Sequence, residues 1–140
     1  MTTAGIGEIS WEMTVDEAQQ AAGARLLRED GGSDECYTAV PEDGPEGVTF
    51  LVADGEVQRV EVTNEAIRTP SGAGVGIDED ELRALFPERL ETTPGGGGNV
   101  LAFVPNSPGE AQWRIVFETD GSEVTSYRAG RLPWVERAGC

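Results

Sequence analysis

The residues best suited to hold another molecule are aromatic and arginine side chains close to the C-terminal end of the chain. Trp113 and Arg114 are adjacent, as are Tyr127 and Arg128. Trp, Tyr and Arg are the residue types that dominate the binding energy of protein interfaces. The sequence therefore predicts recognition of a protein or peptide, with Arg114, Tyr127 and Arg128 on the open face of a sheet.

Two more aromatic candidates, and the strand that carries Trp113, bear on this prediction. Tyr37 and Phe103 occupy nearly equivalent places in two similar halves of the chain, and both are candidate binding residues. Trp113 alternates with Ile115 and Phe117, which places all three on one face of a strand. Large aromatic residues are usually buried, so a core role for Trp113 and Phe117 stands as the alternative.

Nucleophilic and acid–base chemistry is restricted by what the chain lacks. It contains no His, and its 10 basic residues are all Arg. A Ser-His-Asp triad, a Cys-His pair and a Schiff-base Lys are therefore excluded. A carboxylate pair of the glycosidase kind remains open. We expect a non-catalytic domain; the alternatives are a small carboxylate-based hydrolase acting on glycans and a structural component of the cell envelope.

The acidic runs do not have the pattern of a metal site. A calcium loop alternates oxygen ligands around a Gly and ends in a bidentate Glu, and none of the runs does so. Without His or a Cys pair at ligand spacing, zinc is also excluded. We expect solvated surface charge, no metal and no cofactor. The runs are Glu29-Asp30, Asp34-Glu35, Glu42-Asp43 and Asp78 to Glu81.

Three glycines, Gly72, Gly74 and Gly76, precede a predicted helix and suggest a phosphate-binding loop. However, that helix opens with four carboxylates, Asp78 to Glu81, which would repel a phosphate from the helix terminus. The glycine spacing also departs from the dinucleotide-binding fingerprint. We therefore expect an ordinary loop here.

The overall charge limits the kinds of partner. There are 26 Asp and Glu residues, and the net charge is −16. Such a surface repels phosphate backbones and anionic lipids, so we expect no nucleic-acid partner. The apolar share of 38% is ordinary for a globular domain. Coding bias in a GC-rich genome and a high-salt habitat both remain as sources of the acidity.

Two cysteines, Cys36 and Cys140, bear on the compartment. A disulfide between them would fix the C-terminal tail and stabilise the fold by about 4–5 kcal/mol in the chain-entropy model. That pairing predicts an oxidising, extracytoplasmic setting, whereas two unrelated thiols are the alternative. No apolar run is long enough to span a membrane. The first residues do not resemble a signal peptide, and a lipid anchor ahead of residue 1 stays open.

Two helices are predicted from their start and stop signals. Thr14 to Glu17 forms a capping box, and the following helix ends at Gly23. Asp78 to Glu81 is an acidic start for the second helix, which Pro87 stops.

The strands follow each helix. Asp54-Gly55 is a strong hairpin signal, and Asp120 to Ser122 makes a similar, longer turn. Loops are expected at 69–74 and 94–98. The predicted strands are 36–40, 47–53, 56–62, 100–104, 113–119 and 123–127.

The chain matches itself at an offset of about 64 residues, which indicates an internal duplication. Arg25-Leu26 corresponds to Arg89-Leu90, and Val40-Pro41 to Val104-Pro105. The predicted fold is α+β: a single domain, 1–140, made of two tandem helix-plus-strand repeats at about 6–66 and 67–140. Together they would form one antiparallel sheet with helices on one face.

The segment Met13 to Ala18, preceded by Ile6 to Ile9, resembles the I-x-x-G-M-T-x-x-E-A opening of bacterial β-lactamase-inhibitor-protein-like domains. Outer-membrane-assembly small lipoproteins share that opening. Glu12 stands where the family has Gly. Residues 71–76 and the terminal Gly139-Cys140 also look like uncharacterised secreted or lipid-anchored bacterial proteins.

This resemblance implies tandem helix-plus-sheet repeats whose concave sheet face grips a protein partner outside the cytoplasm. The inhibitors carry a disulfide within each repeat, whereas Cys36 and Cys140 lie in different halves here. No position corresponds to the inhibitory hairpin residues. The resemblance therefore supports the fold more than an inhibitor activity.

Overall fold

A computed structural model of the chain describes residues 5–6, 9–10, 13–44, 46–95, 97–105 and 112–136, with the backbone alone for 5–6 and 9–10. The elements in chain order are β1 (Gly5–Ile6), β2 (Ile9–Ser10), α1 (Val15–Ala22), β3 (Leu26–Arg28), β4 (Cys36–Pro41), β5 (Val48–Ala53), β6 (Glu56–Val62), α2 (Glu79–Leu85), β7 (Leu90–Gly95), β8 (Gly98–Phe103), β9 (Trp113–Thr119), β10 (Val124–Arg131) and the short 3₁₀ helix η2 (Trp134–Glu136).

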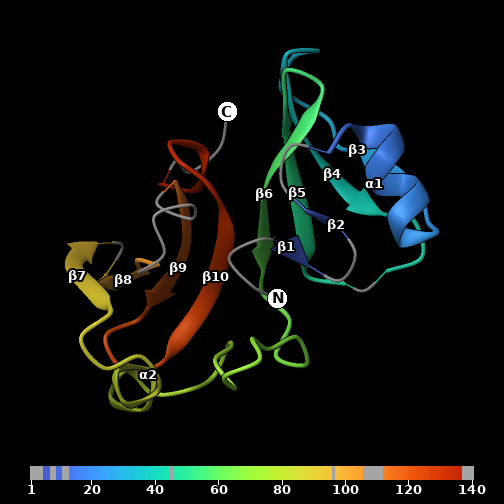
Figure 1. The fold of residues 1–140 in the computed structure, drawn as a ribbon. Helices are drawn as coiled ribbons and strands as arrows, with labels where there is room; N and C mark the ends of the chain where they lie inside the picture. Colours follow the sequence, from blue (N-terminus) through green and yellow to red (C-terminus); the bar gives the residue numbers. More distant parts are fainter. Residues whose placement is uncertain are drawn as a thin grey trace.

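The fold is mainly β. One antiparallel sheet of eight strands runs in the order β3-β4-β5-β6-β10-β9-β8-β7, and β1 and β2 form a separate pair. The predicted single antiparallel sheet is confirmed. The α+β balance is corrected, because α1 and α2 contribute only 8 and 7 residues. Figure 1 shows α1 beside the β3–β6 part of the sheet and α2 at one end of the β7–β10 part.

The predicted helix boundaries follow from local chemistry. The Thr14 hydroxyl accepts a hydrogen bond from the Glu17 backbone N–H at 3.2 Å, and the Glu17 carboxylate accepts one from the Thr14 N–H at 3.2 Å. This reciprocal cap satisfies two donors that the first turn leaves unpaired. Gly23 ends α1 in the left-handed conformation with φ of 67°. Asp78 precedes α2 without a side-chain cap bond.

The turn between β5 and β6 is also as predicted. Asp54 and Gly55 have φ of 54° and 80°. Positive φ at both central residues defines the type I′ turn, whose twist matches that of paired strands. The register follows directly, with Ala53 opposite Glu56.

Two strands of the large sheet, β3 and β7, were not predicted. They are its outer strands, each with a single neighbour. β7 ends in Pro94 and Gly95, so the expected loop at 94–98 is wrong for the residues that belong to β7 and β8. Proline lacks a backbone N–H and is tolerated in an edge strand, where that group has no ladder partner.

One face of the eight-stranded sheet, here called the core face, carries the hydrophobic core. Paired positions across neighbouring strands give the row Val62, Tyr127, Phe117 and Leu101. Each of these four side chains is 0% exposed. Ala18 of α1 and Leu82 of α2 belong to the same core, so both helices pack on this face.

The two parts of the sheet join where β6 pairs with β10. Gly130 lies opposite Arg59 at this join, and a Cβ at Gly130 would approach the backbone O of Gln58 to 2.4 Å. Glycine is required here because the two backbones come too close for any side chain. The pairing of β6 with β10 therefore depends on Gly130, although glycine within a strand usually lowers its stability.

Candidate binding surface

The opposite side of the sheet, here called the back face, is the candidate binding surface. Residues paired directly in an antiparallel sheet lie on the same face. The register therefore places in one row Glu61 of β6, Arg128 of β10, Val116 of β9, Ala102 of β8 and Glu91 of β7. This row crosses the sheet from the join to the β7 edge.

The 3₁₀ helix η2 covers the back face at the join. Two arginines hold it: Arg59 Nη1 donates to the Trp134 carbonyl at 3.3 Å, and Arg128 Nε donates to the Val135 carbonyl at 2.6 Å. Val135 is 0% exposed, and Arg128 is 7% exposed. These hydrogen bonds satisfy carbonyls of a segment too short to form a ladder of its own.

The two arginines that hold η2 each have a carboxylate nearby. Arg128 Nη1 forms an ion pair with Glu118, whose side chain is 40% exposed. Burial lowers the pKa of Arg59, an effect that the nearby Glu61 carboxylate opposes. A guanidinium stays charged at any ordinary pH, so both arginines require these acceptors.

Beyond η2 the back face opens into a groove of about 300 Å³, lined by Glu91, Thr93, Val100, Ala102, Val116, Arg128 and Glu136. Val100, Ala102 and Val116 form an apolar floor on β8 and β9. Glu136 of η2 and Glu91 of β7 stand at its two sides. The groove thus combines a small apolar base with carboxylates at its margins.

Tyr127 does not lie on this surface, so its predicted placement on an open face is wrong. Its ring is 0% exposed and stacks on Phe117 with centroids 5.5 Å apart. Its hydroxyl donates to the Ile67 carbonyl at 2.6 Å, and burial raises the pKa of Tyr127 to about 12. Tyr127 and Arg128 are adjacent in β10, so they point to opposite faces and cannot share one.

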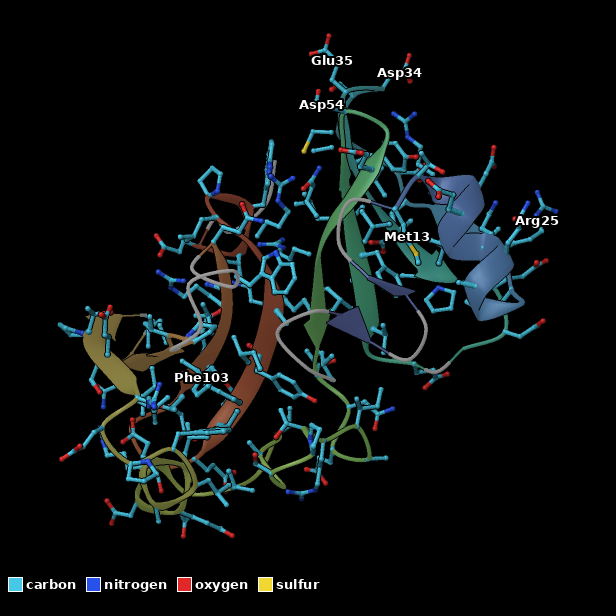
Figure 2. The ribbon with its side chains drawn as sticks, viewed as in Figure 1. Met13, Arg25, Asp34, Glu35, Asp54 and Phe103 are labelled. Atoms are coloured by element: carbon cyan, nitrogen blue, oxygen red, sulfur yellow. The ribbon has the colours of Figure 1, made fainter. Side chains whose placement is uncertain are left out.

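The other predicted aromatic residues also belong to the core face. Trp113, Tyr37 and Phe103 are half-buried and pack against the core. Phe103 lies 4.9 Å from Phe86 between ring centroids, on the α2 side of the sheet (Figure 2). Tyr37 carries the Arg28 guanidinium 4.7 Å from its ring centroid. The core alternative for the aromatics therefore describes these side chains better than an exposed patch does.

The predicted arginines lie on the back face, in different settings. Arg114 pairs with Gly130, in the row that contains Arg59. It is half-buried, and its Nη1 donates to the Trp113 carbonyl at 2.8 Å. Arg128 lines the groove, but its guanidinium already binds Val135 and Glu118. Their roles in binding stay predictions.

The groove residues Glu91, Val100, Ala102, Val116 and Glu136 were missed by sequence analysis. The alternation within 113–119 indicates which face Val116 occupies, but η2 had no sequence signal to place it over that face. Glu91 and Ala102 become neighbours only through the pairing of β7 with β8. The groove is therefore a product of long-range pairing.

One acidic residue has a structural role at the base of α2. Glu79 is 8% exposed and accepts hydrogen bonds from Asn99 Nδ2 and Thr119 Oγ1, each at 2.8 Å. The Asn99 bond and then the Thr119 bond hold the pKa of Glu79 below its usual range. The cluster fixes α2 to β8 and β9.

The remaining acidic runs lie on the surface. Figure 2 shows Asp34, Glu35 and Asp54 at the same end of the molecule, and Asp34 accepts from Arg28 at 2.8 Å. Among the described residues, no group of three or more His, Cys, Asp or Glu is arranged to hold a metal ion.

Cys36 is half-buried at the start of β4, opposite Ala53 of β5, and is not a free thiol. Its predicted partner, Cys140, lies outside the described residues. The Cys36–Cys140 pairing itself stays a prediction. Within the described part of the chain, neither helix has the length and apolar character that crossing a bilayer requires.

Comparison with known proteins gives a fold relationship. No family model matches the chain, and no curated protein matches it. It is similar to the 1.5 Å crystal structure of an extracellular protein containing a SCP domain from Bacillus anthracis str. Ames, with a TM-score of 0.54 and 13% sequence identity. The match covers 86% of this chain and 44% of that chain, so this chain spans less than half of the matched protein. At this identity the likeness shows the fold alone.

These findings overturn the resemblance to β-lactamase-inhibitor-protein-like domains and small outer-membrane lipoproteins. No family model supports it, and the solved structure reported above is an extracellular protein that contains a SCP domain. The quoted motif contains the capping box of α1, and Thr14 and Glu17 do form that box. A capping box occurs at the start of many unrelated helices, so this motif indicates local helix formation and does not indicate a common family.

Proposed function

We propose that the protein is a non-catalytic binding domain that acts outside the cytoplasm and holds a protein or peptide partner on its back face. The groove beside η2 is the observation that carries this proposal. On its floor the half-buried Val100 and Ala102 offer apolar area beside the buried Val116, and its margins offer carboxylates. Interfaces commonly combine a small apolar centre with a polar rim.

The extracytoplasmic location has two supports. The structural neighbour is an extracellular protein, and this chain corresponds to less than half of it, the size of a module within a larger protein. A Cys36–Cys140 disulfide would also belong to an oxidising compartment. Neither support identifies the partner, so the location and the partner are tested together.

The internal duplication is part of the same proposal. Each half contains a helix followed by four strands, and the strand order β3-β4-β5-β6 is mirrored by β7-β8-β9-β10 on the other side of the join. The residues before the helices, Thr14 and Asp78, bridge to Glu56 and Glu123 respectively. Exchange of the turn Asp120 to Ser122 for Asp-Gly tests the equivalence of the two hairpins. We expect a folded variant whose unfolding free energy is lower, because the Glu79 N–H loses the Ser122 carbonyl as its acceptor, and a variant that does not fold would contradict the equivalence.

The binding role is tested by blocking the groove. Immobilised protein is incubated with the secreted and envelope fractions of the native host, and captured proteins are identified by mass spectrometry. Ala102→Phe places a large side chain on the groove floor, and Ala22→Phe makes the same change on the exposed side of α1. We expect Ala102→Phe to abolish a capture that Ala22→Phe retains. Equal capture by both variants would remove the back face as the binding surface.

The non-catalytic assignment is tested on a panel of glycans. A carboxylate-based hydrolase would release reducing sugar, and one Asp or Glu substitution would abolish that release. We expect no release with the purified protein. Turnover that a single carboxylate variant removes would replace the binding proposal by the hydrolase.

A further inference from the structure

We propose that the back-face groove binds a basic side chain, Lys or Arg, of the partner polypeptide. The aliphatic stem would lie on the floor, and the charged head would lie between Glu91 and Glu136. This inference deepens the proposed function and rests on it. Three observations support it: the shape of the groove, the composition of its floor and the charge at its margins.

The floor suits a long, unbranched stem. Val100, Ala102 and Val116 come from adjacent strands and all lie on the back face, which makes a shallow apolar strip. Val116 is 2% exposed, whereas Val100 and Ala102 are half-buried, so the strip opens toward the β7 edge. Lys and Arg side chains bury their methylene groups along such strips while the head stays in water.

The margins suit a positive head. Glu136 and Glu91 line opposite sides of the groove and have no ion-pair partner among the described residues. The one cation in the lining, Arg128, bonds to the Val135 carbonyl and to Glu118. Its charge is therefore balanced within the protein, and the described residues that line the groove carry an excess of negative charge.

The volume of the groove and the net charge of the protein also agree with a basic side chain as the occupant. A volume of about 300 Å³ lies at the lower end of ligand pockets, enough for one long side chain and its flanking backbone. The net charge of −16 attracts cationic segments and repels anionic ones over the whole surface. An acidic peptide would meet carboxylates at both margins, so we expect it to be excluded.

The test uses three peptides that differ at one position. Acetylated, amidated Gly-Gly-X-Gly-Gly carries Lys, norleucine or Glu at X, and ¹⁵N chemical shifts are followed during titration of the full chain. Norleucine keeps the stem and removes the charge. We expect the Lys peptide to shift the amides of Ala102 and Val116, with no matching shift from norleucine or Glu.

Two double variants separate the groove from general attraction. Glu91→Gln with Glu136→Gln removes the marginal charges, whereas Glu65→Gln with Glu81→Gln makes the same net change at exposed carboxylates elsewhere. The groove variant should weaken the Lys peptide by about fivefold, from the loss of two exposed charge contacts. The control should bind as the wild type does. Equal weakening in both variants would overturn the proposal, as would equal shifts from norleucine.

Failure of this inference is distinguishable from failure of the proposed function. If Ala102→Phe abolishes partner capture while the Lys peptide leaves the groove amides unmoved, the binding face stands and the basic side chain is rejected. If no partner is captured and no peptide shifts the groove amides, both are rejected.

Discussion

Replacement of Arg128 by Met gives the sharpest test of how the C-terminal segment is held. Met keeps much of the aliphatic stem and removes the guanidinium. The guanidinium donates to the Val135 carbonyl at 2.6 Å and pairs with Glu118. The variant therefore removes two polar contacts while the packing of the stem changes little.

The expected loss of unfolding free energy is about 2 kcal/mol. A hydrogen bond to a charged group contributes about 1.5–3 kcal/mol. Removing one partner of a fully buried ion pair costs about 3–5 kcal/mol, because the other charge stays buried and unpaired. Here the remaining partner, Glu118, has a side chain that is 40% exposed, so water replaces much of the lost interaction. The lost bond to Val135 therefore decides the magnitude.

The loss is measured by urea unfolding followed by circular dichroism, with Glu118→Gln as the control. Glu118→Gln should cost less than about 1 kcal/mol, because an exposed ion pair contributes little. Hydrogen exchange of the η2 amides should also accelerate in Arg128→Met and remain unchanged in Glu118→Gln. If the two variants lose the same free energy, Arg128 does not hold η2 through Val135.

Three further predictions concern the core, α2 and the disulfide. Tyr127→Phe should cost about 1 kcal/mol at neutral pH through the lost hydroxyl bond. The pKa of Tyr127 is about 12 in the fold and about 10 when unfolded, so its protonated form stabilises the fold below pH 10 and this contribution is lost as the pH rises toward 12. The wild type should therefore lose unfolding free energy faster than Tyr127→Phe across this window in alkaline urea titrations, and parallel curves would contradict the assignment. Thr119→Val should raise the pKa of Glu79. Because that pKa is lowered in the fold, the stability that the ionised carboxylate provides is present above the unfolded pKa of about 4.3 and disappears on acidification. The difference in unfolding free energy between wild type and variant should therefore shrink from pH 6 to pH 3. An unchanged carboxyl ¹³C titration of Glu79 would count against the bond. Cys36 and Cys140 should resist alkylation until reduction in intact-mass measurements, and Cys36→Ser should lower the unfolding free energy by about 4–5 kcal/mol; two freely alkylated thiols would exclude the bridge.

Local chemistry accounts for what the sequence predicted correctly. The capping box at Thr14 and the turn at Asp54-Gly55 each depend on a few neighbouring residues, and both form as predicted. The alternation of Ile115 and Phe117 also places them in the core, because the period of a strand is fixed by its backbone. Such features require no knowledge of which strands pair.

The remaining features depend on pairing across long separations. Tyr127 is buried because Val62 and Phe117 lie beside it on neighbouring strands, and nothing in its own strand distinguishes a covered face from an open one. β7 carries the proline and glycine of an expected loop, yet it forms because β8 supplies a partner. The burial of Arg128 likewise depends on η2 returning to the sheet.

The charged residues of the back face fall into two groups. At the join, Arg59 and Arg128 each donate a hydrogen bond to η2, and Arg128 also pairs with Glu118. Further toward β7, within the described part of the chain, no second segment is held over the sheet in this way, and Glu91 and Glu136 line the groove without an ion-pair partner there. The Glu118 carboxylate balances the charge of Arg128, so Glu91 and Glu136 determine the charge of the described residues that line the groove. Loss of the hydrogen bonds that hold η2 should consequently also weaken the binding of a basic side chain in the groove. The reason is that Glu136 belongs to the segment that Arg59 and Arg128 hold.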